Sequence, residues 1–148
     1  MKLAVYIFAT SLIFASGTCS AQAIKSVADY KAEAEAAVSA INMEDAQNLV
    51  RDDSTVFVDV REKDEIDRLG EIEGSVHVPR GVLEFYIDPK SSMHMDIFSS
   101  GKRVIFYCAT GGRSLLAAKV AKDMGIRDPL YLDGGFGAWS EANETESR

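Results

Sequence analysis

Residues 103–114 read RVIFYCATGGRS, and this stretch decides the fold. Its first five residues form an apolar run that is typical of a strand covered on both faces. After the two glycines, apolar side chains recur at a spacing of four, at Leu116, Val120 and Met124, and Gly125 is placed to end that helix. The sequence therefore predicts a buried strand, a glycine loop and a helix in direct succession.

The rest of the chain alternates predicted strands and helices in the same way. Further strands are expected at 55–60, 74–79 and 130–132, and further helices at 43–50, 62–69 and 136–142. Strands that alternate with helices form a parallel sheet with helices on both faces, so the predicted fold class is α/β. Ligands of such sheets bind beyond the carboxyl ends of the strands, where the loop that begins at Cys108 is expected to lie.

Composition limits the classes of function. The chain has 148 residues, which suits one domain, and its 47% hydrophobic and 26% charged residues are those of a folded globular protein. Its 23 acidic residues outnumber 16 basic ones, and the net charge is −7. This charge argues against nucleic acid and against an anionic membrane surface as partners. Two cysteines, Cys19 and Cys108, are too few for a disulfide scaffold.

The first 23 residues have the features of a secretory signal peptide. Lys2 precedes an uncharged apolar run, and Ala21-Gln22-Ala23 is the best cleavage site, so Ile24 would begin the mature chain. Two alternatives stay open: an uncleaved membrane anchor, and a lipoprotein acylated at Cys19, although Ser16 and Thr18 match that motif poorly. Cleavage predicts a periplasmic or secreted protein without stable membrane association.

The mature chain is expected to have three parts. Residues 24–40 are rich in Ala and Glu and are interpreted as a helical extension that packs on the outside of the domain or acts as a spacer. Residues 41–142 form the domain itself. Residues 143–148 are polar and are expected to be a disordered tail. Within the domain, Phe136 and Trp139 are expected to belong to the core.

The loop after the buried strand carries the candidate chemistry. Gly111 and Gly112 allow a tight turn whose backbone N–H groups point inward, and the start of the following helix adds partial positive charge. Cys108 and Arg113 flank this turn. The expected positive field lowers the pKa of the Cys108 thiol and holds a small anion beside it. The pattern therefore predicts a nucleophilic thiolate with an anionic co-reactant.

Four segments resemble the rhodanese family of single-domain sulfurtransferases, and they occur in the family's order and spacing. They span about two thirds of the chain, from Ile41 to Trp139. Ser75 stands where the family commonly has Ala, and Arg80-Gly81 follows the proline of the second segment. The four segments are VDVRE (58–62), GEIEGSVHVP (70–79), CATGGRS (108–114, with Ala117 and Ala118 behind it) and YLDGGF (131–136, with Trp139).

The resemblance implies sulfur transfer through Cys108. A sulfane sulfur from thiosulfate or a similar donor would be held there as a persulfide and passed to a thiophilic acceptor, cyanide or a thiol. Asp59 and Arg61 would brace the loop from behind, although a purely structural ion pair is the simpler interpretation. The resemblance implies no cofactor, and no metal site is expected at His77 or His94. The substrate would contact Ala109, Thr110, Gly111, Gly112, Arg113 and Ser114.

Loop length separates two chemistries on this fold. Related phosphatases and arsenate reductases have one residue more between the Cys and the Arg than the four found here, Ala109 to Gly112. The shorter loop favours sulfur transfer. Two other functions stay open: a sulfur-carrier or redox-partner protein that acts on protein thiols and has incidental rhodanese activity, and a non-catalytic binding domain that keeps the fold.

Overall fold

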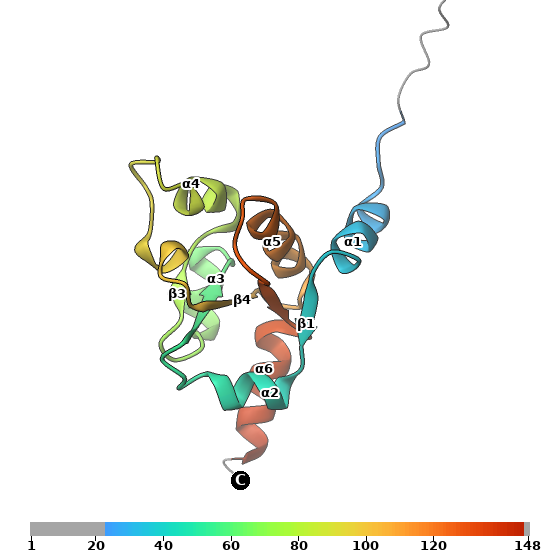
Figure 1. The fold of residues 1–148 in the computed structure, drawn as a ribbon. Coiled ribbons are helices and arrows are strands. Elements are labelled where there is room, and N and C mark those ends of the chain that lie inside the picture. The colour runs from blue at the N-terminus through green and yellow to red at the C-terminus, as the bar shows by residue number, and fades with distance from the viewer. Residues whose placement is uncertain (1–22, 147–148) are drawn as a thin grey trace, which may run out of the picture.

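The computed structural model describes residues 23–146, which contain a five-stranded, fully parallel sheet. The sheet order is β1-β5-β4-β2-β3, so β4 lies at its centre (Figure 1). Each strand is short, and β2 and β4 pair along their whole length, from Thr55 with Arg103 to Asp59 with Tyr107. The strands are β1 (Ser39–Ile41), β2 (Thr55–Asp59), β3 (Val76–His77), β4 (Arg103–Tyr107) and β5 (Leu130–Leu132).

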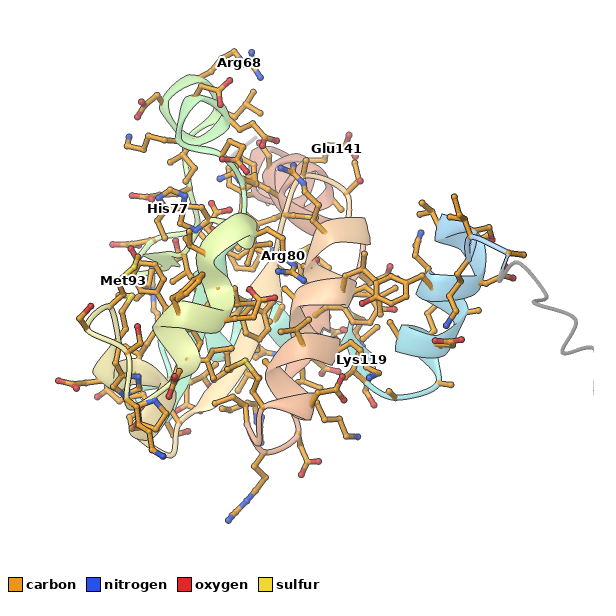
Figure 2. All side chains as sticks on the ribbon, turned by 90° about the horizontal axis from the view of Figure 1, so that it is seen from above. Arg68, His77, Arg80, Met93, Lys119 and Glu141 are labelled. Atoms are coloured by element: carbon orange, nitrogen blue, oxygen red, sulfur yellow. The ribbon has the colours of Figure 1, made fainter. Side chains whose placement is uncertain are left out.

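Helices cover both faces of this sheet, as the sequence predicted. Helices α1, α4 and α5 contribute to one core, and α2 and α6 to the other (Figure 1). Seen from above, α4 and α5 lie next to each other, and α1 packs beside α5 (Figure 2). The helices are α1 (Val27–Glu35), α2 (Met43–Leu49), α3 (Lys63–Leu69), α4 (Leu83–Ile87), α5 (Gly112–Asp123) and α6 (Gly135–Glu146), with short 3-10 turns η1 (Arg80–Val82) and η2 (Asp96–Ser99).

The two central strands supply both cores because successive side chains point to opposite faces. In β4, Val104 and Phe106 face the α5 side, whereas Ile105 and Tyr107 face the α6 side. Cys108 continues this alternation and belongs to the α5 side. On the opposite side, Phe136 and Trp139 of α6 are buried, as the sequence predicted.

The amino-terminal part of the domain differs from the sequence interpretation. The predicted helical extension over 24–40 ends early, because α1 stops at Glu35 and Ser39 already belongs to the sheet. Strand β1 pairs with β5, from Ser39 with Leu130 to Ile41 with Leu132. Ala34 and Val38 are buried in the α5-side core, so the end of α1 and the turn after it are part of the domain rather than a spacer.

The carboxyl-terminal part is more regular than expected. Helix α6 runs to Glu146, so residues 143–146 of the predicted disordered tail are helical. Within this helix, the side-chain amide of Asn143 donates to the carbonyl oxygen of Trp139 at 2.8 Å. Of the predicted signal peptide, only Ala23 belongs to the described residues. Cys19 lies outside them. Among the residues that are described, none of the helices is long and apolar enough to cross a membrane.

Candidate active site

Cys108 follows the central strand directly, and α5 begins four residues later at Gly112. Because all strands are parallel, the segments after β2, β4 and β5 meet at one edge of the sheet. The loop between β4 and α5 therefore lies between the segments that follow β2 and β5. The structure places Cys108 at the expected position, between a buried strand and the first turn of a helix.

Hydrogen-bond donors of the loop converge on the Cys108 sulfur. Gly111 adopts a left-handed conformation with φ 97°, and its N–H group donates to Sγ at 3.3 Å. The hydroxyl of Ser114 lies 3.6 Å from Sγ and 2.9 Å from the carbonyl oxygen of Gly111. Since a hydroxyl has one hydrogen, the sulfur and that carbonyl compete for it.

Burial and hydrogen bonding act in opposite directions on this thiol. Cys108 is 1% exposed, and burial, the largest single influence, raises its pKa. The Ser114 hydroxyl and the amides of Ser114, Thr110 and Gly111 donate hydrogen bonds that favour the thiolate. Together they outweigh burial, so the pKa of Cys108 lies below that of an ordinary cysteine.

Arg113 is engaged differently from the sequence expectation. Its Nη1 and Nη2 donate to the two carboxylate oxygens of Glu65 on α3, at 2.6 and 2.7 Å. This ion pair is the main cause of the raised pKa of Arg113, and Cys108 is a lesser one. Conversely, the leading influences that lower the pKa of Cys108 are hydrogen bonds rather than the guanidinium. Arg113 therefore interacts with Cys108, as expected, but its main partner is Glu65 rather than the sulfur.

Glu65 is the residue of this site that sequence reasoning missed. It occupies the third position of α3, and one of its carboxylate oxygens also accepts from the Glu62 N–H at 3.0 Å, completing a capping box. Hydrogen bonds from Arg113, together with the Glu62 amide, hold the pKa of Glu65 at about 2. The spacing of Glu62 and Glu65 was a visible helix-start signal, but it did not indicate the partner on α5.

The segment after β5 clamps the other side of the loop. The Phe136 N–H donates to the Cys108 carbonyl oxygen at 2.7 Å, and the Gly137 N–H donates to the Ala109 carbonyl oxygen at 3.0 Å. Gly135 has a φ of 62° and lies so close that an added Cβ would be 2.5 Å from the Cys108 oxygen. The turn at 134–135 thus fits against the loop backbone in a way that only glycine allows.

Asp59 and Arg61 form a fully buried ion pair behind this clamp. Arg61 donates from Nη2 to an Asp59 oxygen at 2.6 Å and to the Gly70 carbonyl oxygen at 2.8 Å. Its guanidinium carbon lies 4.2 Å from the centre of the Phe136 ring. The pair therefore contacts the residue whose N–H group holds the Cys108 carbonyl. Nη1 of Arg61 is buried and has no hydrogen-bond partner among the described residues.

The neighbouring polar side chains have structural partners. The Tyr107 hydroxyl accepts from the Ile72 N–H at 3.2 Å and lies 2.8 Å from the Ser75 hydroxyl, and burial raises the pKa of Tyr107. His77 contacts the Arg61 carbonyl oxygen through Nε2 at 2.9 Å. Within residues 23–146, no three His, Cys, Asp or Glu side chains group in a way that could hold a metal ion.

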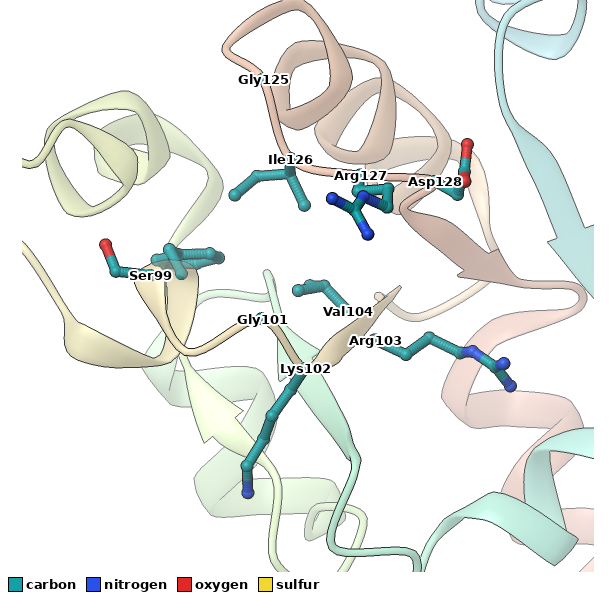
Figure 3. A pocket seen from close by; sticks show the side chains of 10 residues that line it. Ser99, Gly101, Lys102, Arg103, Val104, Gly125, Ile126, Arg127 and Asp128 are labelled. Atoms are coloured by element: carbon teal, nitrogen blue, oxygen red, sulfur yellow. The ribbon is translucent and has the colours of Figure 1, made fainter.

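A hollow of about 500 Å³ lies at the opposite edge of the sheet, where β4 begins (Figure 3). Lys102, Arg103 and Arg127 line it, together with apolar side chains that include Ile126 and Val104. Since β4 runs from Arg103 to Tyr107, this hollow and the Cys108 loop are separated by the length of the strand. The hollow is therefore not part of the candidate active site.

Replacing Gly135 with Ala should destabilise the protein by about 2–4 kcal/mol, because the new Cβ meets backbone atoms of the loop and Ala is strained at this φ. Urea unfolding measures the change. Gly81→Ala is the matched control, since Gly81 has open space and no positive φ, and it should change stability by less than about 0.5 kcal/mol. Equal effects of the two substitutions would contradict the close fit at Gly135.

Ser114→Ala should raise the pKa of Cys108, since it removes a hydroxyl that donates to the thiolate and leaves the burial in place. The pH dependence of the iodoacetamide labelling rate measures this, and its midpoint should move to higher pH. Thr110→Ala is the control in the same loop, because Thr110 acts through its backbone N–H. An unchanged midpoint for Ser114→Ala would show that the hydroxyl does not stabilise the thiolate.

Comparisons with known proteins agree with this architecture. The thiosulfate:glutathione sulfurtransferase of Saccharomyces cerevisiae is 32% identical over 109 residues, which cover 69% of this chain and 78% of that protein. A solved structure from Rhodopseudomonas palustris, of a protein of unknown function described as a possible tyrosine phosphatase, is 41% identical with a TM-score of 0.78. That match covers 84% of this chain and 96% of the other.

The fold is also shared with more distant proteins. The human single-domain sulfurtransferase is 22% identical, with a TM-score of 0.60 over 70% of this chain and 96% of that one. The rhodanese-like domain family matches residues 42–142, a segment that includes the Cys108 loop, Glu65 and the clamp at Phe136. The resemblance inferred from the sequence is confirmed at this level: the chain belongs to the rhodanese-like domain family.

Proposed function

We propose that the protein is a sulfurtransferase that carries a sulfane sulfur on Cys108. The observation that supports this most is the convergence of N–H and O–H donors on a thiol whose pKa is lowered despite burial. A thiolate is the reactive form of cysteine, and the donors that hold it also suit the negative charge of a persulfide. Relatives named as sulfurtransferases support the same class of reaction.

The proposed reaction has two balanced steps. The Cys108 thiolate attacks the outer sulfur of thiosulfate, a Cys–S–S⁻ persulfide forms, and the old S–S bond breaks with its electron pair leaving on sulfite. Cyanide or a thiolate then attacks the outer sulfur, and the Cys108 thiolate leaves. The outer sulfur of the persulfide lies about 2.0 Å beyond the buried Sγ, at the length of an S–S bond. The acceptor therefore attacks this outer sulfur and does not have to reach Sγ itself.

A phosphatase is the second candidate, because the similar protein from Rhodopseudomonas palustris is described as a possible tyrosine phosphatase. The spacing of this loop favours the sulfurtransferase. Cys108 and Arg113 have four residues between them, and the resemblance associates one residue more with phosphate and arsenate chemistry. The Arg113 guanidinium is also occupied by Glu65 rather than turned as a free bidentate donor toward a phosphate.

The acceptor and the compartment belong to the proposal as well. A protein thiol is an alternative to a small acceptor, and the net charge of −7 would suit a basic partner protein. The signal-like segment at 1–23 supports export, with a periplasmic or secreted mature chain that begins at Ile24. Intact mass of the exported protein tests the cleavage, and a chain that retains residues 1–23 would contradict it.

Incubation with thiosulfate should increase the intact mass by about 32 Da, one sulfur atom, because a persulfide is a stable enough cysteine adduct to be weighed. Cyanide should then restore the original mass and release thiocyanate. Cys108→Ser should abolish both changes. No gain in mass, or full thiocyanate production by Cys108→Ser, would contradict the proposal. Hydrolysis of an aryl phosphate without any sulfur uptake would instead support the phosphatase.

A further inference from the structure

The ion pair between Arg113 and Glu65 determines the net charge next to the Cys108 loop. Both terminal nitrogens of Arg113 are bound to the Glu65 carboxylate, at 2.6 and 2.7 Å. The same carboxylate accepts from the Glu62 N–H at 3.0 Å, so three N–H groups hold it in place. The positive charge that follows Cys108 in the sequence is therefore matched by a negative charge from α3.

The three ionisable groups together disfavour a highly charged donor. Arg113 contributes one positive charge, whereas Glu65 and the Cys108 thiolate contribute one negative charge each, so their sum is negative. The side chains of Arg113 and Glu65 are 38% and 19% exposed, so solvent screens them only in part. The pKa of Glu65 is about 2, so this carboxylate stays ionised wherever the protein would work. An incoming dianion meets more repulsion here than a monoanion does.

We propose that Glu65 is a specificity-determining residue that disfavours dianionic sulfur donors and favours donors with one negative charge, such as organic thiosulfonates. This inference rests on the proposed sulfur transfer through Cys108. With a thiosulfonate, the Cys108 thiolate attacks the terminal sulfur, the persulfide forms, and the electron pair of the broken S–S bond leaves on a sulfinate monoanion. The chemistry at sulfur is the same as with thiosulfate, but the leaving group carries one negative charge less.

Glu65→Gln tests the proposal because Gln keeps the size and the capping position but removes the charge. The value of kcat/KM for thiocyanate production is measured with thiosulfate and with methanethiosulfonate at fixed pH, salt and cyanide. The ratio of the two values cancels any change in the reactivity of Cys108. In Glu65→Gln the ratio of kcat/KM for thiosulfate to kcat/KM for methanethiosulfonate should rise by about fivefold or more, because the loss of one negative charge relieves more repulsion for a dianion than for a monoanion.

Glu33→Gln is the matched control. Glu33 of α1 pairs with Lys25, which precedes that helix, and both side chains are about half exposed, so this substitution makes the same change in net charge on another element. Its ratio should stay within about twofold of the unsubstituted protein, because exposed distant charges are largely screened. A rise in Glu33→Gln equal to that in Glu65→Gln would assign the effect to overall charge and overturn the proposal.

The remaining outcomes separate this inference from the proposed function. If the unsubstituted protein transfers sulfur but the ratio in Glu65→Gln is unchanged, the role of Glu65 is overturned and the sulfurtransferase stands. If neither donor gives thiocyanate with the unsubstituted protein, the proposed function itself fails. Glu65→Ala is a second neutral variant in case Glu65→Gln does not fold, since the Glu62 half of the capping box remains, and the same rise in ratio is expected.

Discussion

The structure of the site depends on hydrogen-bond donors that surround one buried sulfur. Desolvation alone would keep Cys108 protonated and unreactive. The left-handed turn at Gly111 and the hydroxyl of Ser114 reverse that preference by directing donors at Sγ. These donors come from the backbone between a central strand and a helix and from the first turn of that helix, so the fold itself creates the environment of the thiol.

The loop is held from both sides rather than by its own residues alone. On one side, the backbone after β5 binds the carbonyl groups of Cys108 and Ala109, and Gly135 allows the close approach. The buried Asp59–Arg61 pair contacts the Phe136 ring that belongs to this clamp. On the other side, Glu65 of α3 holds Arg113. Donors that are fixed before the reaction require little reorganisation when negative charge develops at sulfur.

The sequence was most informative where a local pattern determines the structure. The central strands were predicted because apolar runs at 55–60 and 103–107 need cover on both faces, and the structure confirms strands there. Strand β1 was missed because Ser39–Ile41 is short, and pairing with β5 rather than local propensity makes it a strand. The end of α6 was placed too early because polar residues also continue an exposed helix.

Long-range contacts were the part of the site that the sequence could not supply. Arg113 was expected to add positive charge beside Cys108 and to contact the substrate, but the sequence did not indicate that Glu65, 48 residues away, binds both of its terminal nitrogens. Asp59 and Arg61 were correctly interpreted as an ion pair, yet their contact with Phe136 depends on how β2 and α6 pack. Spacing within a motif does not encode such partners.

The most direct test of the account is an ultraviolet titration of the Cys108 thiolate in the folded protein, taken as a difference against Cys108→Ser. If the hydrogen-bond donors outweigh burial, the pKa of Cys108 lies below that of a cysteine in a short unstructured peptide. Thiolate absorbance should then appear at lower pH in the protein than in the peptide. Absorbance that appears at the same pH as in the peptide, or at higher pH, would show that burial dominates and would contradict the account.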